Sequence, residues 1–198
     1  MKNIKLVLIA LFVSIGAIAQ AQIKWNVDPA HTKVQFTAIH MGVSEVTGEF
    51  KKFEGKITSD DENFTNTTIE FTMQVASVST DNDMRDTHLK SDDFFNAEKY
   101  PTITFKSKSF KKIDGNKYIL TGDLTMRDIT KSVDLAVIYN GKITDPYGFL
   151  RAGFKVAGKI NRMDYNLKWN TLMGAGDAVV SNEISFNCNI ELTKDKGK

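Results

Sequence analysis

The chain has 198 residues, of which 41% are hydrophobic, 10% aromatic and 25% charged. This composition excludes a disordered chain, which would be less apolar, and a multi-span membrane protein, which would carry fewer charges. The 26 basic and 24 acidic residues give a net charge of +2, and the chain without Lys2 and Lys5 is neutral. The charge balance therefore argues against a nucleic-acid partner.

The first 21 residues have the three-part order of a secretory signal peptide. Lys2 and Lys5 precede an apolar run, and small-x-small cleavage motifs end at Ala19 and Ala21. The run is too short to span a bilayer comfortably, and no Cys stands at the cleavage point to accept a lipid. We expect residues 1–21 to be removed. Residues 22–198 would then form one exported domain, periplasmic or secreted, without stable insertion into a membrane.

Alternating apolar and polar residues dominate the rest of the chain, as in residues 33–38, and predict half-buried antiparallel strands. Turn signals at Asp114-Gly115-Asn116, Asn140-Gly141 and Asp145-Pro146-Tyr147-Gly148 separate several of these runs. The expected strands cover residues 23–28, 32–40, 46–58, 67–78, 101–111, 116–127, 131–140, 149–161 and 182–193.

The polar segment 79–96 lacks this alternation and predicts a partly helical crossover. Thr80 or Asp81 can cap a short helix, and Ser91 can cap a second turn. An excursion of this length in a compact β domain usually closes one end of the fold or carries function. The apolar anchors of the crossover are Leu89, Phe94 and Phe95.

About eight antiparallel strands predict an all-β fold, a single closed barrel with a short helical crossover. A barrel of this size is either filled by its own side chains or holds one small ligand. The inward rows contain many Phe and Met residues and few charges. This pattern is compatible with both a filled core and an apolar pocket.

The sequence contains no common catalytic or metal-binding motif. Its three histidines, His31, His40 and His88, lack the close spacing of a zinc site, and only His88 with Asp86 forms a local catalytic candidate. The single cysteine, Cys188, lies in an alternating apolar row, which indicates a buried thiol rather than a nucleophile. We therefore expect a protein that is not an enzyme and needs no metal or cofactor.

Short motifs follow one another in a distinctive order, namely Asp28-Pro29-Ala30-His31, Gly48-Glu49-Phe50, Arg85-Asp86-Thr87-His88, Tyr100-Pro101-Thr102 and Asn161-Arg162-Met163-Asp164-Tyr165. In this order they resemble the YceI-like family of exported, lipocalin-like polyisoprenoid-binding proteins, from about Trp25 to Leu192. The resemblance implies an elongated barrel whose internal channel takes an isoprenoid-like or other long amphiphilic chain. Asp128 and Asn166 depart from the glycines that the family favours, but both residue types tolerate positive φ.

The apolar inner face and the resemblance together predict a periplasmic carrier or storage protein for a polyisoprenoid or an isoprenoid quinone. One alternative is a fatty-acid or fatty-amide carrier of the same fold. Others are a hydrolase or isomerase acting on such a lipid, and a filled barrel with a stress or interaction role. A homodimer is left open.

Side-chain parity along the strands and the anchors of the crossover define the expected ligand-binding residues. The polar head of a ligand belongs at a channel end, because burying an unpaired polar group costs about 1–3 kcal/mol. The candidates for this contact are Arg85, Asp86 and His88 in the crossover. Arg162 and Asp164, two residues apart on one side of an expected strand, form a second candidate pair. The full set is Phe36, Ala38, Phe71, Met73, Val75, His88, Leu89, Phe94, Phe95, Ile103, Phe105, Leu120, Leu124, Phe154, Val156, Arg162 and Phe186.

Overall fold

The structure is a computed structural model that describes residues 21–172 and 179–194. Apart from Ala21, the predicted signal peptide lies outside these residues. The helical elements are α1 (Asp83–Lys90) and two 3-10 turns, η1 (Val75–Ser77) and η2 (Arg162–Tyr165). The strands are β1 (Ile23–Val27), β2 (Lys33–His40), β3 (Ser44–Phe50), β4 (Phe53–Ser59), β5 (Thr68–Gln74), β6 (Val78–Ser79), β7 (Thr102–Asp114), β8 (Lys117–Met126), β9 (Ile129–Thr144), β10 (Leu150–Asn161) and β11 (Val180–Lys194).

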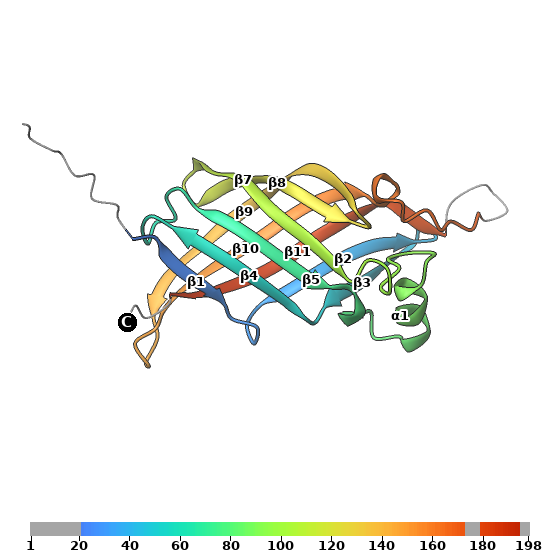
Figure 1. Cartoon of the computed structure of the whole chain (residues 1–198), viewed down its shortest axis with the longest axis horizontal. Helices are drawn as coiled ribbons and strands as arrows, with labels where there is room; N and C mark the ends of the chain where they lie inside the picture. The colour runs from blue at the N-terminus through green and yellow to red at the C-terminus, as the bar shows by residue number, and fades with distance from the viewer. Residues whose placement is uncertain (1–20, 173–178, 195–198) are drawn as a thin grey trace, which may run out of the picture.

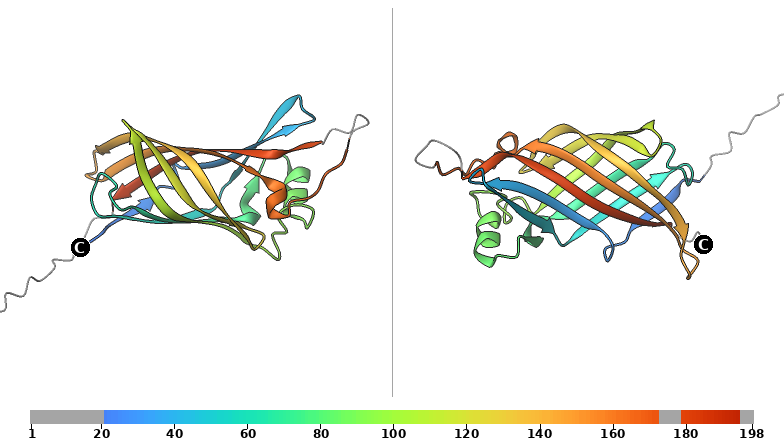
Figure 2. Two further views of the ribbon diagram at one scale, coloured as in Figure 1. Left: turned by 90° about the horizontal axis from the view of Figure 1, so that it is seen from above. Right: turned by 180° about the vertical axis from the view of Figure 1, so that it is seen from behind.

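The eleven strands join one antiparallel sheet that closes into a barrel of eight strand positions. β1 and β2 share one position, because β11 pairs with both, at Val27↔Leu192 and at Val34↔Cys188. β3 and β4 share the next position, paired with β2 and β1 respectively. Figures 1 and 2 show an elongated barrel with oblique strands and with α1 at one end. The predicted fold, a lipocalin-like antiparallel barrel of about eight strands, is confirmed.

The strand predicted over residues 46–58 is wrong in one respect, because it breaks at Lys51 and Lys52. β4 pairs with β5, whereas β3 pairs with the short β6. The backbone N–H groups of Lys51 and Lys52 donate to the backbone oxygen and the hydroxyl of Ser77. The strand predicted over residues 67–78 likewise ends at Gln74, because the chain turns through η1 there.

The structure confirms some of the turns predicted from the sequence and corrects one of them. Asp114-Gly115-Asn116 joins β7 to β8, and Asp128 and Asn166 have the positive φ values, 60° and 59°, that their residue types predict. The strand end predicted at Asn140-Gly141 is wrong, because β9 continues to Thr144. Gly141 has φ of 106°, and the β9–β10 register shifts opposite it, so this glycine makes a bulge rather than a turn.

The crossover contains the expected short helix, but Asn82 caps it rather than Thr80 or Asp81. The Asn82 side chain accepts a hydrogen bond from the Arg85 backbone N–H at 3.0 Å. Thr80 is unavailable as a cap, because its N–H and hydroxyl both donate to the buried Asp86 carboxylate, at 2.8 and 2.6 Å. The second helical turn expected after Ser91 is instead a run of non-helical turns.

The end of the barrel opposite α1 is closed by aromatic packing. Trp25 on β1 and Phe64 in the β4–β5 loop stack with ring centroids 4.6 Å apart, and both are buried. The Trp25 indole N–H donates to the Ser59 hydroxyl at 2.9 Å, so the only polar atom of this side chain has a partner. We call Trp25 and Phe64 the aromatic plug.

No helix in the described ranges is long and apolar enough to span a membrane.

Candidate ligand cavity

The barrel encloses an apolar cavity of about 160 Å³. Gln35 and Thr67 are the only polar residues among the described side chains that line it. The apolar lining comes from strands all around the barrel, because inward positions alternate with outward ones along each strand. It consists of Val34, Phe36, Phe50, Ile57, Phe64, Ile69, Phe71, Met73, Phe105, Phe110, Leu120, Leu124, Val133, Leu135, Val137, Phe154, Val156, Phe186, Cys188, Ile190 and Leu192.

A second apolar cavity, of about 80 Å³, lies next to α1. Leu89 of α1 and the Phe94–Phe95 pair after it line one side, and Arg162 and Leu167 line another. The two cavities share five lining residues, whose side chains stand between them: Phe36, Phe50, Met73, Leu124 and Phe186. We call these the shared residues.

Of the seventeen predicted ligand-binding residues, the structure places fifteen around these cavities. Those that line only the larger cavity are Phe71, Phe105, Leu120, Phe154 and Val156. Those that line only the smaller cavity are Ala38, Leu89, Phe94, Phe95, Ile103 and Arg162. Phe36, Met73, Leu124 and Phe186 line both.

Val75 and His88 line neither cavity. Val75 is buried, but it begins η1 instead of continuing β5, so strand parity does not apply to it. The His88 imidazole Nε2 lies 2.8 Å from the Asp93 carboxylate, and its ring packs edge-on against Phe94 and Trp169. The His88–Asp86 pair considered as a catalytic candidate does not form, since Asp86 bonds Thr80.

Arg162 is a buried charged residue at this end, with 2% of its surface exposed. Arg162 and Asp164 lie in η2, so the prediction that they point to the same side of a strand is wrong. Desolvation lowers the pKa of Arg162, and no described carboxylate forms an ion pair with it. Its guanidinium donates instead to the backbone oxygens of Leu167, Trp169, Val180 and Ser181 and to the Asn182 side-chain oxygen.

The lining also includes residues that the sequence-based set lacks. Val133, Leu135 and Val137 alternate along β9 and could have been found by the same parity argument. Phe64 gives no such signal, because it lies in a loop and enters the barrel with φ of 63°. Phe50 stands at the end of β3. The predicted strand continued through the break that follows it, so alternation along that strand did not identify Phe50 as an inward residue.

Cys188 lines the larger cavity, and desolvation raises the pKa of its thiol to about 11. Its Sγ lies 3.8 Å from the Gln35 backbone oxygen. A thiol with this pKa is protonated near neutral pH, so it contributes to the apolar surface rather than acting as a nucleophile.

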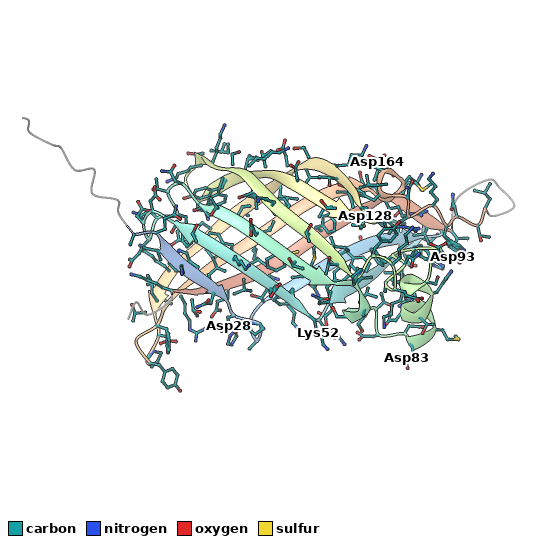
Figure 3. All side chains as sticks on the ribbon, viewed as in Figure 1. Asp28, Lys52, Asp83, Asp93, Asp128 and Asp164 are labelled. Atoms are coloured by element: carbon teal, nitrogen blue, oxygen red, sulfur yellow. The ribbon has the colours of Figure 1, made fainter. Side chains whose placement is uncertain are left out.

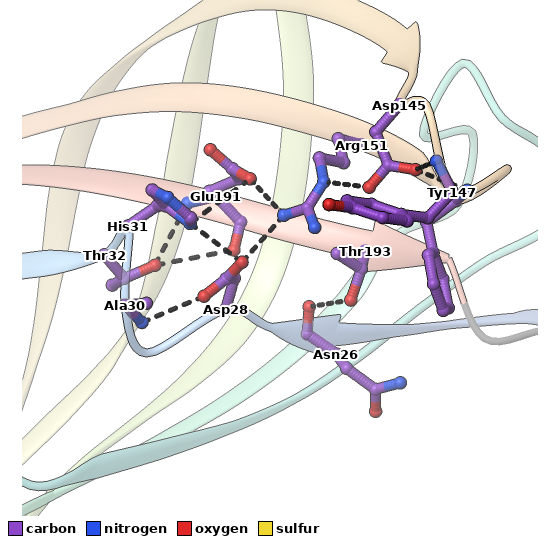
Figure 4. A network of polar contacts seen from close by, with 11 residues as sticks. Asn26, Asp28, Ala30, His31, Thr32, Asp145, Tyr147, Arg151, Glu191 and Thr193 are labelled. Atoms are coloured by element: carbon purple, nitrogen blue, oxygen red, sulfur yellow. Dashed lines mark hydrogen bonds and ion pairs between the residues drawn. The ribbon is translucent and has the colours of Figure 1, made fainter.

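A polar network lies where the chain leaves the barrel wall between β1 and β2 (Figure 4). Arg151 bridges the carboxylates of Asp28, Asp145 and Glu191 at 2.6–2.7 Å. Hydrogen bonds from His31 and Arg151 lower the pKa of Asp28 to about 2, and Asp28 in turn raises the pKa of His31. Ligand atoms of Asp28, His31 and Glu191 lie within 4.8 Å of one another, a spacing that a metal ion could use. Arg151 forms ion pairs with both carboxylates, so its single positive charge offsets part of their negative charge.

A model of the YceI-like domain matches residues 25–192. The chain belongs to the YceI-like family. Its YceI relatives include a UPF0312 protein of Photorhabdus laumondii, 40% identical over 80% of this chain and 82% of that protein. Protein YceI of Escherichia coli O6:H1 is 41% identical over 80% of this chain and 83% of its own length.

Several solved structures share this barrel. A Campylobacter jejuni YceI protein is 32% identical, with a TM-score of 0.68 over 80% of this chain and 90% of that one. BcnA of Burkholderia cenocepacia is 26% identical, with a TM-score of 0.71 over 83% and 98%. A polyisoprenoid-binding domain from Saccharophagus degradans, 14% identical with a TM-score of 0.62 over 87% and 99%, shows a likeness of fold.

Proposed function

We propose that this YceI-like protein is an exported carrier or store for a long apolar or amphiphilic chain, a polyisoprenoid or an isoprenoid quinone. The observation that carries the proposal is the pair of neighbouring apolar cavities, which have the shared residues in common. Polyisoprenoid is also the ligand class named for the Saccharophagus degradans domain, which has the same fold. The burial of several hundred Å² of hydrocarbon at roughly 25 cal/mol per Å² would bind a chain without any charged contact.

The volume of the cavities limits how such a chain can enter. An engineered cavity of about 150 Å³ binds a molecule the size of benzene. The larger cavity, at about 160 Å³, therefore takes only a short part of an isoprenoid chain without rearrangement. A long chain must displace the shared residues and join the two cavities. Phe, Met and Leu side chains can do this by changing rotamer.

Binding rather than catalysis is proposed because of the chemistry of the lining. Arg162 is the one charged group among the described residues that line the cavities, and its N–H groups already donate to carbonyl and amide oxygens. The Cys188 thiol has no basic side chain beside it in the lining. Among the described lining residues, this arrangement provides apolar contact without a nucleophile–base pair.

Export is the second part of the proposal, and it rests on the sequence order of residues 1–21. We expect cleavage after Ala19 or Ala21 and a periplasmic or secreted protein. Intact mass of the exported protein measures this directly. A chain that still begins at Met1 contradicts the export proposal.

The ligand class is tested by mass spectrometry of an organic extract of the purified protein. A polyisoprenoid or isoprenoid quinone at near-stoichiometric amount supports the proposal, whereas a fatty acid or fatty amide identifies a different carrier of the same fold. A second readout is alkylation of Cys188, the single thiol, by a small apolar reagent. We expect added isoprenoid to slow this reaction, and an empty extract with unchanged alkylation contradicts the proposal.

Two variants on neighbouring positions of β5 provide a matched control. Phe71 lines the larger cavity, whereas Glu70 points outward and pairs with Lys106 at 3.1 Å. Phe71→Asn should weaken isoprenoid binding about tenfold or more, because it removes apolar contact and leaves an amide facing the cavity. Glu70→Asn should leave binding unchanged, and an equal loss in both variants shows that the chain does not bind inside the barrel.

A further inference from the structure

The turn between β2 and β3 has an unusual residue at its tip. Met41 and Gly42 both have positive φ, 52° and 72°, and the Val43 N–H donates to the His40 oxygen at 3.1 Å. Turns with positive φ at both central residues favour Asn, Asp or Gly at the first of them, because other side chains are strained there. Met41 is therefore a strained residue at the tip of this turn.

The tip is apolar and exposed. Met41 is 43% exposed and Val43 is 84% exposed. The Met41 N–H donates to the Val179 oxygen at 2.9 Å, and the Val179 N–H donates to the Thr171 oxygen at 3.0 Å. These bonds bring in the neighbour of Thr171, Leu172, which is 64% exposed. We call Met41, Val43 and Leu172 the apolar tip.

The apolar tip stands beside the smaller cavity. Val180 follows Val179 directly, pairs with His40 of β2 and lines that cavity. Figures 1 and 2 show the β2–β3 turn at the same end of the barrel as α1, beyond the strands that enclose the cavities. The exposed apolar side chains are thus placed where a chain entering the smaller cavity would pass.

We propose that the apolar tip docks on a lipid bilayer by inserting Met41, Val43 and Leu172 into the boundary between headgroups and acyl chains. Side chains on turn tips can enter this boundary singly, because a bilayer needs no complementary shape. A second copy of the chain fits less well, since a stable protein interface needs about 800 Å² of continuous surface on each partner. Ser44 and Glu45 follow Val43 directly and interrupt the apolar surface.

The docking proposal extends the proposed carrier function and depends on it, because docking would serve to transfer the bound chain. A chain insoluble in water could move between the bilayer and the smaller cavity without crossing the solvent. The tip residues are uncharged, so docking should occur on a neutral bilayer and should depend little on salt.

Co-sedimentation with neutral phosphatidylcholine vesicles tests the proposal. The test variant, Met41→Asn with Val43→Ser, removes apolar area and places a favoured residue at the strained turn position, so folding is preserved. The matched control, Ile113→Ser with Ile143→Ser, removes residues that are 64% and 71% exposed toward the opposite end. All proteins are purified in the same form, so the N-terminal segment contributes equally.

We expect the test variant to lose about tenfold in vesicle partitioning and the control to lose less than about twofold. Equal binding of all three proteins, or equal loss in both variants, overturns the docking proposal. A wild-type dimer that the test variant abolishes would identify a second copy as the occupant and would also overturn it.

Protection of Cys188 by isoprenoid in vesicle-free solution separates this proposal from the proposed function. The test variant should retain that protection, because its substitutions lie outside the cavities. Wild-type protein that partitions onto vesicles but shows no protection supports docking and contradicts the carrier function. Protection of Cys188 without partitioning onto vesicles supports the carrier function and contradicts docking.

Discussion

The two ends of the barrel are closed in different ways. At the β1 end, the aromatic plug is buried, and the loop behind it folds around Asp61, which accepts hydrogen bonds from the Asn63 and Thr65 N–H groups and from the Thr65 hydroxyl. At the α1 end, the half-buried Trp169 packs on Phe94, with ring centroids 5.3 Å apart. Figure 3 places Asp93 and Asp164 at the α1 end and Asp28 away from it.

The two ends therefore differ in how readily they can open. The plug depends on buried aromatic contact within strands and a short loop, so opening it exposes core surface. The α1 end depends on a helix of eight residues and on a segment held to β11 mainly by Arg162. Phe94, Phe95 and Leu167 are buried at this end as well, but a segment outside the strands that is held by a few hydrogen bonds opens more readily than a strand. We therefore propose that the ligand enters at the α1 end.

Replacing one tryptophan at each end gives the largest expected contrast. Trp25→Ala removes a side chain that is 2% exposed and should lower the free energy of unfolding by about 3–5 kcal/mol. Trp169→Ala, at a half-buried position, should cost about 1 kcal/mol. Urea unfolding of both variants measures the difference. Equal losses would show that the two ends are closed equally firmly.

Arg162→Met tests whether one side chain holds the α1 end. The variant leaves the Leu167, Trp169 and Val180 oxygens without their donor, and we expect a loss of about 3 kcal/mol. Amide hydrogen exchange should rise in residues 162–172 and not around Trp25. As a control, Arg127→Met removes an arginine bonded to the Asp92 and Phe94 oxygens and should leave residues 162–172 unchanged. An equal increase in amide exchange across the whole barrel would show that Arg162 does not act locally.

Met73→Ala tests the separation between the cavities. Met73 is one of the shared residues, and its truncation should cost about 2 kcal/mol of stability. The same change should join the cavities and strengthen isoprenoid binding, because the chain no longer has to displace this side chain. Binding and unfolding measured on one preparation should move in opposite directions. Weaker binding would mean that Met73 contacts the ligand rather than blocking it.

The outer network between β1 and β2 predicts a smaller, pH-dependent effect. The pKa of Asp28, about 2, lies below its ordinary value of 3.8, so the ionised carboxylate stabilises the fold above pH 3.8. This contribution, about 1–2 kcal/mol, is lost as the pH falls from 3.8 toward 2. Asp28→Asn should flatten the unfolding curve in that range. An unchanged acid dependence in the variant would assign the loss to other carboxylates.

The fold could be predicted from the sequence, and most of the predicted ligand-binding residues do line a cavity, because strand parity is a local property. Phe71 and Phe105 face the cavity for the same reason that Glu70 faces the solvent. Parity fails where the chain leaves a strand, as at Val75 in η1 and at Phe64 in a loop.

The roles of His88 and Arg162 depend on contacts that no local pattern contains. His88 meets Asp93 and Trp169, and Arg162 meets the start of β11, about twenty residues further along the chain. Residue spacing placed His88 near Asp86 and placed Arg162 on the same side of a strand as Asp164, but the contacts of both side chains are with other residues.

If the two cavities form one channel for a long chain, a tryptophan near each cavity should report on a different end of that chain. Trp25 stacks on Phe64, which lines the larger cavity, and Trp169 packs on Phe94, which lines the smaller one. Single-tryptophan proteins, Trp25→Phe and Trp169→Phe, are titrated with isoprenoid chains brominated at one terminus. We expect bromine at one terminus to quench Trp25 and bromine at the other terminus to quench Trp169. Failure of any chain to quench Trp25, or quenching of both tryptophans by either terminus alike, would contradict a chain threaded through the barrel.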